Sequence, residues 1–264
     1  MSGVLCCWAN ISEEVAEWFE DEYLATTVNE NVAHSVHCEV TSSGMENEPV
    51  GKLDSPWPYL TIHEVYSVDE ANKTTNDRIK NPPAPLVASP LNGSRFDIRT
   101  YREIKRWQAE DWEGEGGGGK NASADPAPPG LMSLDIEHVA SVAAMEWSIE
   151  AYKKEEIMKF YTDVVGPTIS SSPDVLRFRV FEIDSATTIE GEKSEVKEKE
   201  NLHQLFTLVE LESEEWPWDV VIDLAEEQAW KDYFEKQHCV KWQLSHYLVR
   251  KAFHKENRGP AASK

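Results

Sequence analysis

Residues 17–28 read EWFEDEYLATTV, and this segment decides how the chain begins to fold. Trp18 and Phe19, with Val15 one turn earlier, form an apolar stripe at helical spacing, so the pattern predicts an amphipathic helix. An apolar run, VLCCWA, precedes the segment, and an alternating run, HSVHCEV, follows it. Both runs are typical of strands. The segment therefore indicates a strand–helix–strand unit at the start of the chain.

Further strands are expected in the first half. Alternation over residues 33–40 and 59–66 predicts a second and a third strand, and residues 96–104 predict a fourth. The acidic, proline-containing segment before the fourth strand has a weak pattern but leaves room for another helix. The expected order is β-α-β-β-α-β, the ferredoxin-like plan of four antiparallel strands with both helices on one face.

The second half repeats this order. Placing Phe160 over Trp18 aligns the first helices of the two halves, and the alignment continues without a gap to Ala33 and Val175. The fold class predicted is α+β, with two tandem ferredoxin-like β-α-β-β-α-β repeats forming a pseudo-dimeric α+β barrel. Because each repeat can cover the sheet of the other, we expect a monomer. The strands are predicted over residues 144–149, 175–183, 204–211 and 240–249, and the helices over 157–165 and 219–237.

Low-complexity segments set the expected boundaries. Residues 113–130, EGEGGGGKNASADPAPPG, can bury almost nothing and predict a flexible linker. The first ferredoxin-like repeat is then expected over residues 1–112, the second over 131–254, and a disordered tail over 255–264. The charged run over residues 190–201 predicts a solvated or disordered loop.

Composition excludes several classes of partner. The chain has 48 acidic and 26 basic residues, and its formal net charge of −22 repels phosphate backbones and anionic lipids. Neither an apolar run of membrane-spanning length nor a signal-peptide pattern is found. We therefore expect a cytoplasmic protein with a small-molecule substrate and no nucleic acid or membrane partner. The four cysteines lack C-x-x-C spacing, which favours reduced core thiols.

The motifs resemble a known family. EWFEDEYLATTV resembles the W-Y-D-x-E-H-L-P-x-R-L stretch of the EthD-like branch of the dimeric α+β barrel superfamily, and PDVLRFRVF resembles the strand that follows it there. The closing pattern, EWPWDVVIDLAEEQAWKDYFEK and then VKWQLSHYLV, is similar to that of fungal tandem EthD-like proteins.

The resemblance implies a ligand cavity between each sheet and its partner. Many relatives carry out small-molecule chemistry without a metal or an organic cofactor, so the resemblance implies such chemistry here as well. These relatives include oxygenases, decarboxylases, dehydratases and cyclases. The family's helical histidine falls on Tyr23 in the first repeat and on Val165 in the second. The usual acid or base of the family is therefore missing from both helices.

Strand alternation selects candidate catalytic residues. His37 shares a strand face with Ser35, and His63 shares one with Thr61. We expect both faces to point away from the helices, because the opposite faces are more apolar. If they line a cavity, His37 and His63 can transfer protons, with Tyr23 at the rim. A structural role for the two histidines, or binding without chemistry, stays open.

Other polar residues are candidates for substrate binding. Arg99 can hold a carboxylate or enolate oxygen. Arg179 aligns with His37, so the two repeats are expected to differ chemically. No metal site is predicted, because His34 and His37 point to opposite strand faces. The substrate-binding candidates are Arg99, Tyr101, Tyr59 and Arg179.

Together these observations favour a cofactor-independent enzyme of secondary metabolism that acts on a polyketide-like or aromatic small molecule. The reaction would be decarboxylation, dehydration or cyclisation by histidine-based acid/base chemistry, and a cofactor-free oxygenase is the alternative within this class. The loss of the helical histidine supports a second hypothesis, a non-catalytic small-molecule-binding or assembly protein. A third is a degenerate barrel with no pocket. The sequence does not decide whether the protein is an enzyme.

Overall fold

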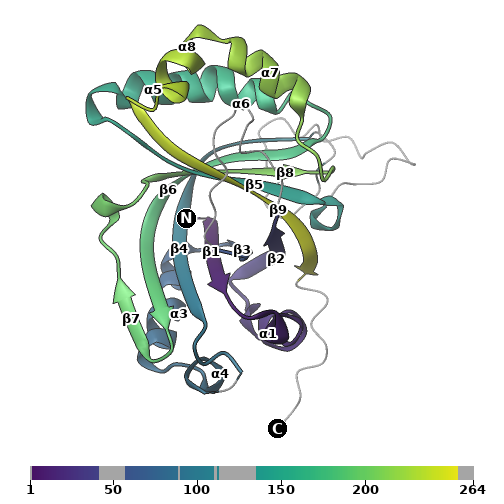
Figure 1. Cartoon of the computed structure of the whole chain (residues 1–264), viewed down its shortest axis with the longest axis vertical. Coiled ribbons are helices and arrows are strands. Elements are labelled where there is room, and N and C mark those ends of the chain that lie inside the picture. Colours follow the sequence, from purple (N-terminus) through teal and green to yellow (C-terminus); the bar gives the residue numbers. More distant parts are fainter. Residues whose placement is uncertain (1, 42–56, 89, 110–111, 113–134, 255–264) are drawn as a thin grey trace.

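A computed structural model of the chain describes residues 2–41, 57–88, 90–109, 112 and 135–254. These residues form a closed barrel of antiparallel strands with helices on its outside (Figure 1). The linker expected at residues 113–130 and the tail expected at 255–264 lie outside the described residues. The domain boundaries that depend on them therefore stay predictions.

The first half has the order of elements expected from its sequence. Its strands form an antiparallel sheet in the order β4-β1-β3-β2, which is the ferredoxin-like arrangement. The weakly patterned segment before the last strand contains two helices. The elements are β1 (Gly3–Asn10), α1 (Glu13–Trp18), a π-helical turn (Phe19–Tyr23), α2 (Leu24–Thr27), β2 (Val32–Val40), β3 (Tyr59–Val65), α3 (Val68–Lys80), α4 (Ala84–Val87) and β4 (Arg95–Gln108).

The second half has the equivalent sheet, in the order β9-β5-β8-β6. One expectation was wrong in part: the charged run at residues 190–201 is exposed, but it includes a strand, β7, that pairs with the end of β6. None of the described helices is long and apolar enough to cross a membrane. The main elements are β5 (Ser141–Ile149), α5 (Lys154–Phe160), a π-helical turn (Tyr161–Val165), α6 (Gly166–Ile169), β6 (Val175–Glu190), β7 (Lys193–Val196), β8 (Leu205–Leu211), α7 (Trp218–Glu226), α8 (Gln228–Trp230), a π-helical turn (Lys231–Glu235) and β9 (Val240–His254).

Two pairings between the halves close the barrel. β2 pairs with β9, and the long strand β4 pairs with β6 from Arg95 opposite Glu190 to Gln108 opposite Arg177. These pairings use the edges that each four-stranded sheet would otherwise leave open. The predicted fold class, a pseudo-dimeric α+β barrel of two ferredoxin-like units, is confirmed.

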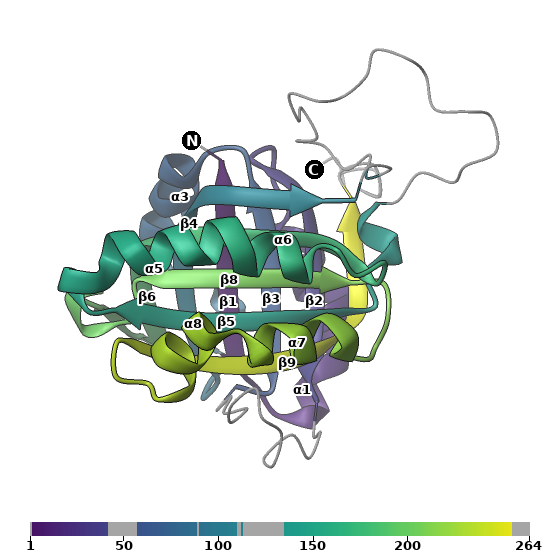
Figure 2. The same cartoon turned by 90° about the horizontal axis from the view of Figure 1, so that it is seen from above.

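Closure buries both faces of each sheet. The outer faces pack against helices, and Figure 2 shows the second-half helices lying over the sheet and running roughly along β8, β5 and β9. The inner faces meet in the barrel interior, where Leu60 of the first half and Phe206 of the second belong to one apolar cluster. Apolar side chains are therefore needed on both faces, and apolarity alone does not reveal which face carries the helices.

A cluster of buried charges links the two halves inside the barrel. Arg177 and Arg179 on β6 each donate to Glu64 on β3 at 2.9 Å, and both also donate to Glu210 on β8. Burial alone would raise the pKa of each carboxyl group, but the two guanidinium groups outweigh it and hold both pKa values below their usual range. His34 contacts Glu64 at 3.0 Å and completes this ion cluster.

The alignment of the two repeats holds for the helices but slips by one residue on the strands. Trp18 and Phe160 each directly precede a π-helical turn, as the alignment predicts. On the following strands, however, His37 packs on the helix side whereas Arg179 faces the barrel interior. Because side chains alternate between faces, this difference means a one-residue shift. The predicted equivalence of His37 and Arg179 is therefore wrong.

Candidate functional site

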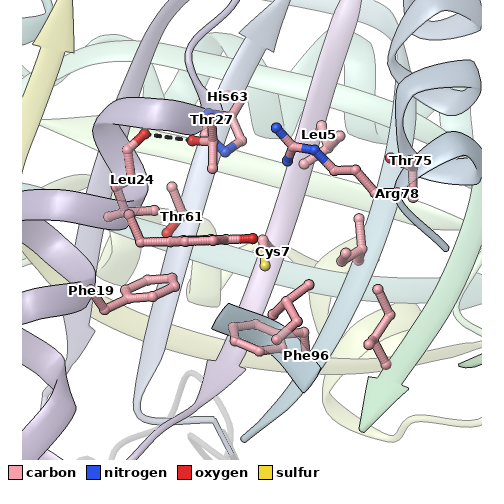
Figure 3. Close-up of a pocket in the computed structure, with 14 residues that line it drawn as sticks. Leu5, Cys7, Phe19, Leu24, Thr27, Thr61, His63, Thr75, Arg78 and Phe96 are labelled. Atoms are coloured by element: carbon pink, nitrogen blue, oxygen red, sulfur yellow. Dashed lines mark hydrogen bonds between the residues drawn. The ribbon is translucent and has the colours of Figure 1, made fainter. Parts of the chain in front are cut away.

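A cavity of about 60 Å³ lies in the first half, between the outer face of the sheet and the helices (Figure 3). The resemblance implied a cavity between the two sheets, and this one is instead between a sheet and its own helices. One wall residue, Ile189, comes from the second half. The lining residues are Leu5, Cys7, Phe19, Tyr23, Leu24, Thr27, Thr61, His63, Thr75, Arg78, Leu86, Phe96, Ile98 and Ile189.

The π-helical turn Phe19–Tyr23 forms one wall of the cavity. Phe19 and Tyr23 stack with ring centroids 5.4 Å apart and both line the cavity, while the intervening Glu20 is close to the sheet. The wider turn allows more side chains to face the sheet than a regular α-helical turn does, and such turns are frequent at functional sites. Tyr23 thus lines a cavity, but on the helix side of the sheet and not on the side for which it was predicted.

His63 contributes an imidazole to the cavity wall. Its Nδ1 atom lies 2.6 Å from the hydroxyl oxygen of Ser35 on the neighbouring strand β2. Among the described residues, the contact with Ser35 is the one hydrogen bond found for this ring, and it leaves the Nε2 atom without a partner. Burial, and next the nearby Arg78, lower the pKa of His63 to about 4. At neutral pH the ring is uncharged, with one nitrogen occupied by Ser35.

His37 is on the same sheet face but does not line the cavity. Its Nδ1 atom is 2.8 Å from the Thr61 hydroxyl, its ring stacks on Tyr59, and its Nε2 atom lies 3.7 Å from Glu20. Burial, with Arg250 next in weight, lowers its pKa to about 3. His37 therefore contacts two lining residues, Thr61 and Phe19, without lining the cavity itself, and Tyr59 contacts His37 rather than the cavity.

Arg78 is the charged group of the cavity lining, and the sequence analysis missed it. It lies in the last turn of α3, and Figure 3 shows its guanidinium group reaching toward His63. Val68, Ala71, Thr75 and Arg78 are spaced by three, four and three residues, so they lie on one face of the helix. The two apolar members of this row are buried. Extending their face along α3 would have placed Thr75 and Arg78 toward the sheet.

The thiol and the phenol in the cavity are uncharged at neutral pH. Burial raises the pKa of Cys7 to about 12, and it raises the pKa of Tyr23, with Arg78 opposing both shifts. Cys7 is thus a poor nucleophile in this cavity. No hydrogen bond of the Tyr23 hydroxyl is found within the described residues, so this group is available to a ligand.

Three predicted binding residues lie on the other side of the sheet. Arg99 donates to Asp97 at 2.9 Å and also to Glu146, Tyr101 stacks on Phe206 at 4.7 Å, and Arg179 belongs to the ion cluster. The sheet of the first half separates all three from His63. The structure therefore does not bring the predicted polar residues together. The assignment of the His37 and His63 faces to the non-helix side was wrong, because that side is itself an apolar core.

A second cavity of about 60 Å³ occupies the equivalent place in the second half. Thr207 takes the position of Thr61, and its hydroxyl is already bonded to Trp147 and Tyr161. Its lining contains no histidine, lysine or arginine and is largely aromatic and aliphatic. The two cavities therefore differ in chemistry: an imidazole, a thiol and a guanidinium group line the first, and none of these lines the second.

The described residues contain no group of histidine, cysteine and acidic side chains that could hold a metal ion. Cys6, Cys7, Cys38 and Cys239 are free thiols.

Buried histidines are expected to make stability depend on pH. The pKa of His63 is lowered to about 4, that of His246 to about 4 and that of His37 to about 3, in each case mainly by burial. An unfolded histidine binds a proton near pH 6.5, whereas these rings stay neutral in the folded chain, so stability is full above about pH 6.5 and is lost as the pH falls toward 4.

The measurement is the free energy of unfolding in urea at several pH values. His63→Gln should reduce the loss between about pH 6.5 and 4, and replacement of the exposed His238 by Gln should leave that loss unchanged. Equal pH dependence in wild type and His63→Gln would contradict the expectation.

Comparison with known proteins finds similarity in structure only. No family model matches the chain, and no curated protein matches its sequence. The solved structure of an anthrone oxidase-like protein is 12% identical, with a TM-score of 0.57 over 99% of this chain and 96% of that chain. Two proteins named "putative monooxygenase" have TM-scores of 0.49. The one from Fusobacterium nucleatum is 10% identical and aligns over 96% of this chain and 95% of that chain. The one from Lactobacillus acidophilus is 7% identical and aligns over 98% and 97%.

The first of these similarities extends over nearly the whole of both chains, and at 12% identity it concerns the fold. The finer assignment to tandem EthD-like proteins stays a resemblance in sequence. By the order of its strands and by this similarity, the chain has a barrel fold made of two ferredoxin-like units.

Proposed function

We propose that this protein is a cofactor-independent enzyme that transfers a proton on a small organic molecule bound in the first-half cavity. The single observation that carries the proposal is the environment of His63. Its ring is neutral, its Nδ1 atom is within hydrogen-bond distance of the Ser35 hydroxyl, and it lines a mostly apolar cavity that Tyr23 also lines. A neutral imidazole in such a place can act as a general base.

The proposed step is removal of a proton from an acidic C–H or O–H group by the His63 Nε2 atom, in the tautomer whose Nδ1–H donates to the Ser35 hydroxyl. The bonding electrons stay on the substrate as an enolate or phenolate, and His63 becomes an imidazolium that can return the proton at another atom. Return of the proton permits cyclisation, or dehydration with loss of water. An anionic intermediate of this kind also accompanies decarboxylation, where carbon dioxide leaves and the proton replaces it.

The oxygenase alternative begins with the same deprotonation and differs in its next reactant. There the substrate anion would be oxidised by dioxygen, which is reduced. Oxygen consumption therefore distinguishes the two reactions. A role in secondary metabolism, a cytoplasmic location, a polyketide-like or aromatic substrate and a monomeric state are further parts of the proposal, and the loss of the family's helical histidine keeps a non-catalytic binding protein as the rival.

Proton transfer can be measured before the natural substrate is known. In oxygen-free D₂O, the protein should accelerate deuterium incorporation into small carbon acids such as a β-keto ester or anthrone, followed by NMR. His63→Gln is expected to lower the enzyme-dependent rate by on the order of 10²-fold, the usual effect of losing a general base.

His246→Gln is the matched control, because His246 is also buried with a pKa lowered to about 4 but lies in the second half. Equal exchange rates in wild type and a folded His63→Gln variant would remove His63 from the mechanism. If the protein does not accelerate deuterium exchange of any carbon acid over the rate in buffer, the result favours the hypothesis of a non-catalytic binding protein.

A further inference from the structure

Arg78 brings a positive charge to the cavity without an acidic partner. Its side chain is half-buried, and no ion pair or hydrogen bond from it is found in the described part of the chain. A half-buried guanidinium group with no counter-ion is costly, because part of its hydration is lost. The other buried or half-buried arginines each have a carboxylate: Arg99 has Asp97, Arg102 has Asp184, Arg106 has Glu103, and Arg177 and Arg179 have Glu210.

The groups that face Arg78 from the surrounding elements do not balance its charge. His63 on β3 is a neutral imidazole, Cys7 on β1 is a neutral thiol, and Tyr23 on the π-helical turn is a neutral phenol. Thr61 and Thr75 add only hydroxyl groups. The chain as a whole carries a formal charge of −22, so acidic side chains are abundant, yet none of those that the structure describes pairs with Arg78.

We propose that the cavity selects a ligand with an anionic oxygen and that Arg78 binds this oxygen. The oxygen is a carboxylate already present on the ligand, or the enolate or phenolate oxygen formed when His63 takes a proton. The inference rests on the proposed function, since it names the ligand class of the same cavity. The remainder of the ligand is apolar, because Phe19, Leu86 and Phe96 form its surroundings.

The charge of Arg78 affects His63 differently before and after an anion binds. Arg78 lowers the pKa of His63 while the cavity is empty of anions. An anionic oxygen beside Arg78 offsets that effect and stabilises the protonated ring. A ligand that binds as a carboxylate thus makes His63 a stronger base before proton transfer, whereas an enolate or phenolate oxygen stabilises the protonated ring only as it forms.

A matched pair of probes tests the charge preference directly. Benzoate and benzamide have the same ring and similar shape, but only benzoate is charged at pH 7. By titration calorimetry, we expect the wild-type protein to bind benzoate at least about 10-fold more tightly than benzamide, the size expected for a charge-assisted hydrogen bond. Arg78→Gln should abolish this preference, and Arg78→Lys should restore part of it.

Arg95→Gln is the control, because Arg95 is exposed and lies outside the cavity lining. It should retain the preference for benzoate. Two results overturn the inference while leaving proton transfer by His63 standing: equal affinity of the wild type for both probes, or unchanged benzoate affinity in a folded Arg78→Gln variant. Failure of the wild type to bind either probe at millimolar concentration would overturn the ligand cavity itself, and the proposed function with it.

Discussion

Glu210→Leu is expected to lower the free energy of unfolding by roughly 3–5 kcal/mol, the usual cost of removing one partner from a buried ion pair. Glu210 accepts hydrogen bonds from both Arg177 and Arg179, and all three side chains are at most 1% exposed. Without Glu210, two buried guanidinium groups share only Glu64 as an acidic partner. These guanidinium groups cannot return to water while the barrel is closed. The free-energy cost of removing them from water is therefore no longer offset by ion pairing with Glu210.

The effect can be measured by urea unfolding at neutral pH, where both carboxylates are ionised. Asp232→Asn is the comparison, because it breaks the exposed pair with Lys236 and should cost less than about 1 kcal/mol. The double variant Arg177→Met with Glu210→Leu removes one charge of each sign, so we expect it to recover part of the lost stability. A Glu210→Leu variant no less stable than Asp232→Asn would show that water reaches the ion cluster.

Gly3→Ala is expected to destabilise the fold by at least about 4 kcal/mol, near the upper end for single substitutions. Gly3 lies on β1 between β3 and β4, and a Cβ atom there would be 1.9 Å from the backbone oxygen of Tyr101 and 2.7 Å from Val68. The oxygen belongs to a paired strand and cannot rotate away. The strand or helix α3 must therefore move.

Thermal or urea unfolding would show this change as a large drop in midpoint. Ser2→Ala is a suitable control, because Ser2 directly precedes Gly3 and its side chain is exposed. Loss of the Ser2 hydroxyl should change the free energy of unfolding by no more than about 0.5 kcal/mol. A Gly3→Ala variant with near-wild-type stability would mean that β1 and β4 lie farther apart near Gly3.

The order of helices and strands could be predicted because each element has its own periodicity. Val15, Trp18 and Phe19 mark a helix, and the alternation around His37 marks a strand, whatever lies around them. The two tandem ferredoxin-like units followed from the repetition of that order. The pairing of β4 with β6 makes both strands longer than expected, because their far ends continue beyond their own sheets and pair with each other.

The faces of the strands could not be predicted in the same way. On β3, Leu60 and Ile62 pack in the barrel interior, while Thr61 and His63 face the helices. An apolar face usually marks the helix side of an open sheet, but in a closed barrel the opposite side is also a core. The sequence therefore showed that His37 and His63 share a face, and it could not show which one.

The candidate site was only partly accessible for a related reason. Tyr23 and His63, which line the cavity, were among the predicted residues: Tyr23 because the family's helical histidine falls on it, and His63 because it is a polar residue on a strand. Arg78 was missed because α3 has few apolar residues, and its face is defined only once Val68 and Ala71 are seen to be buried. Arg99, Tyr101 and Arg179 were grouped with the histidines although the sheet separates them.

The joining of two units in one chain has a consequence for how the protein can change. In a barrel made of two identical chains, every substitution occurs twice, so both cavities must gain or lose a group together. Here Arg78 and His63 line one cavity while Val165 and Thr207 line the other, and Ile189 of the second half still completes the wall of the first. Covalent linkage thus allows the two units to change independently. One unit can lose its polar lining and still contribute to the wall of the other unit's cavity, while that other unit keeps its polar groups.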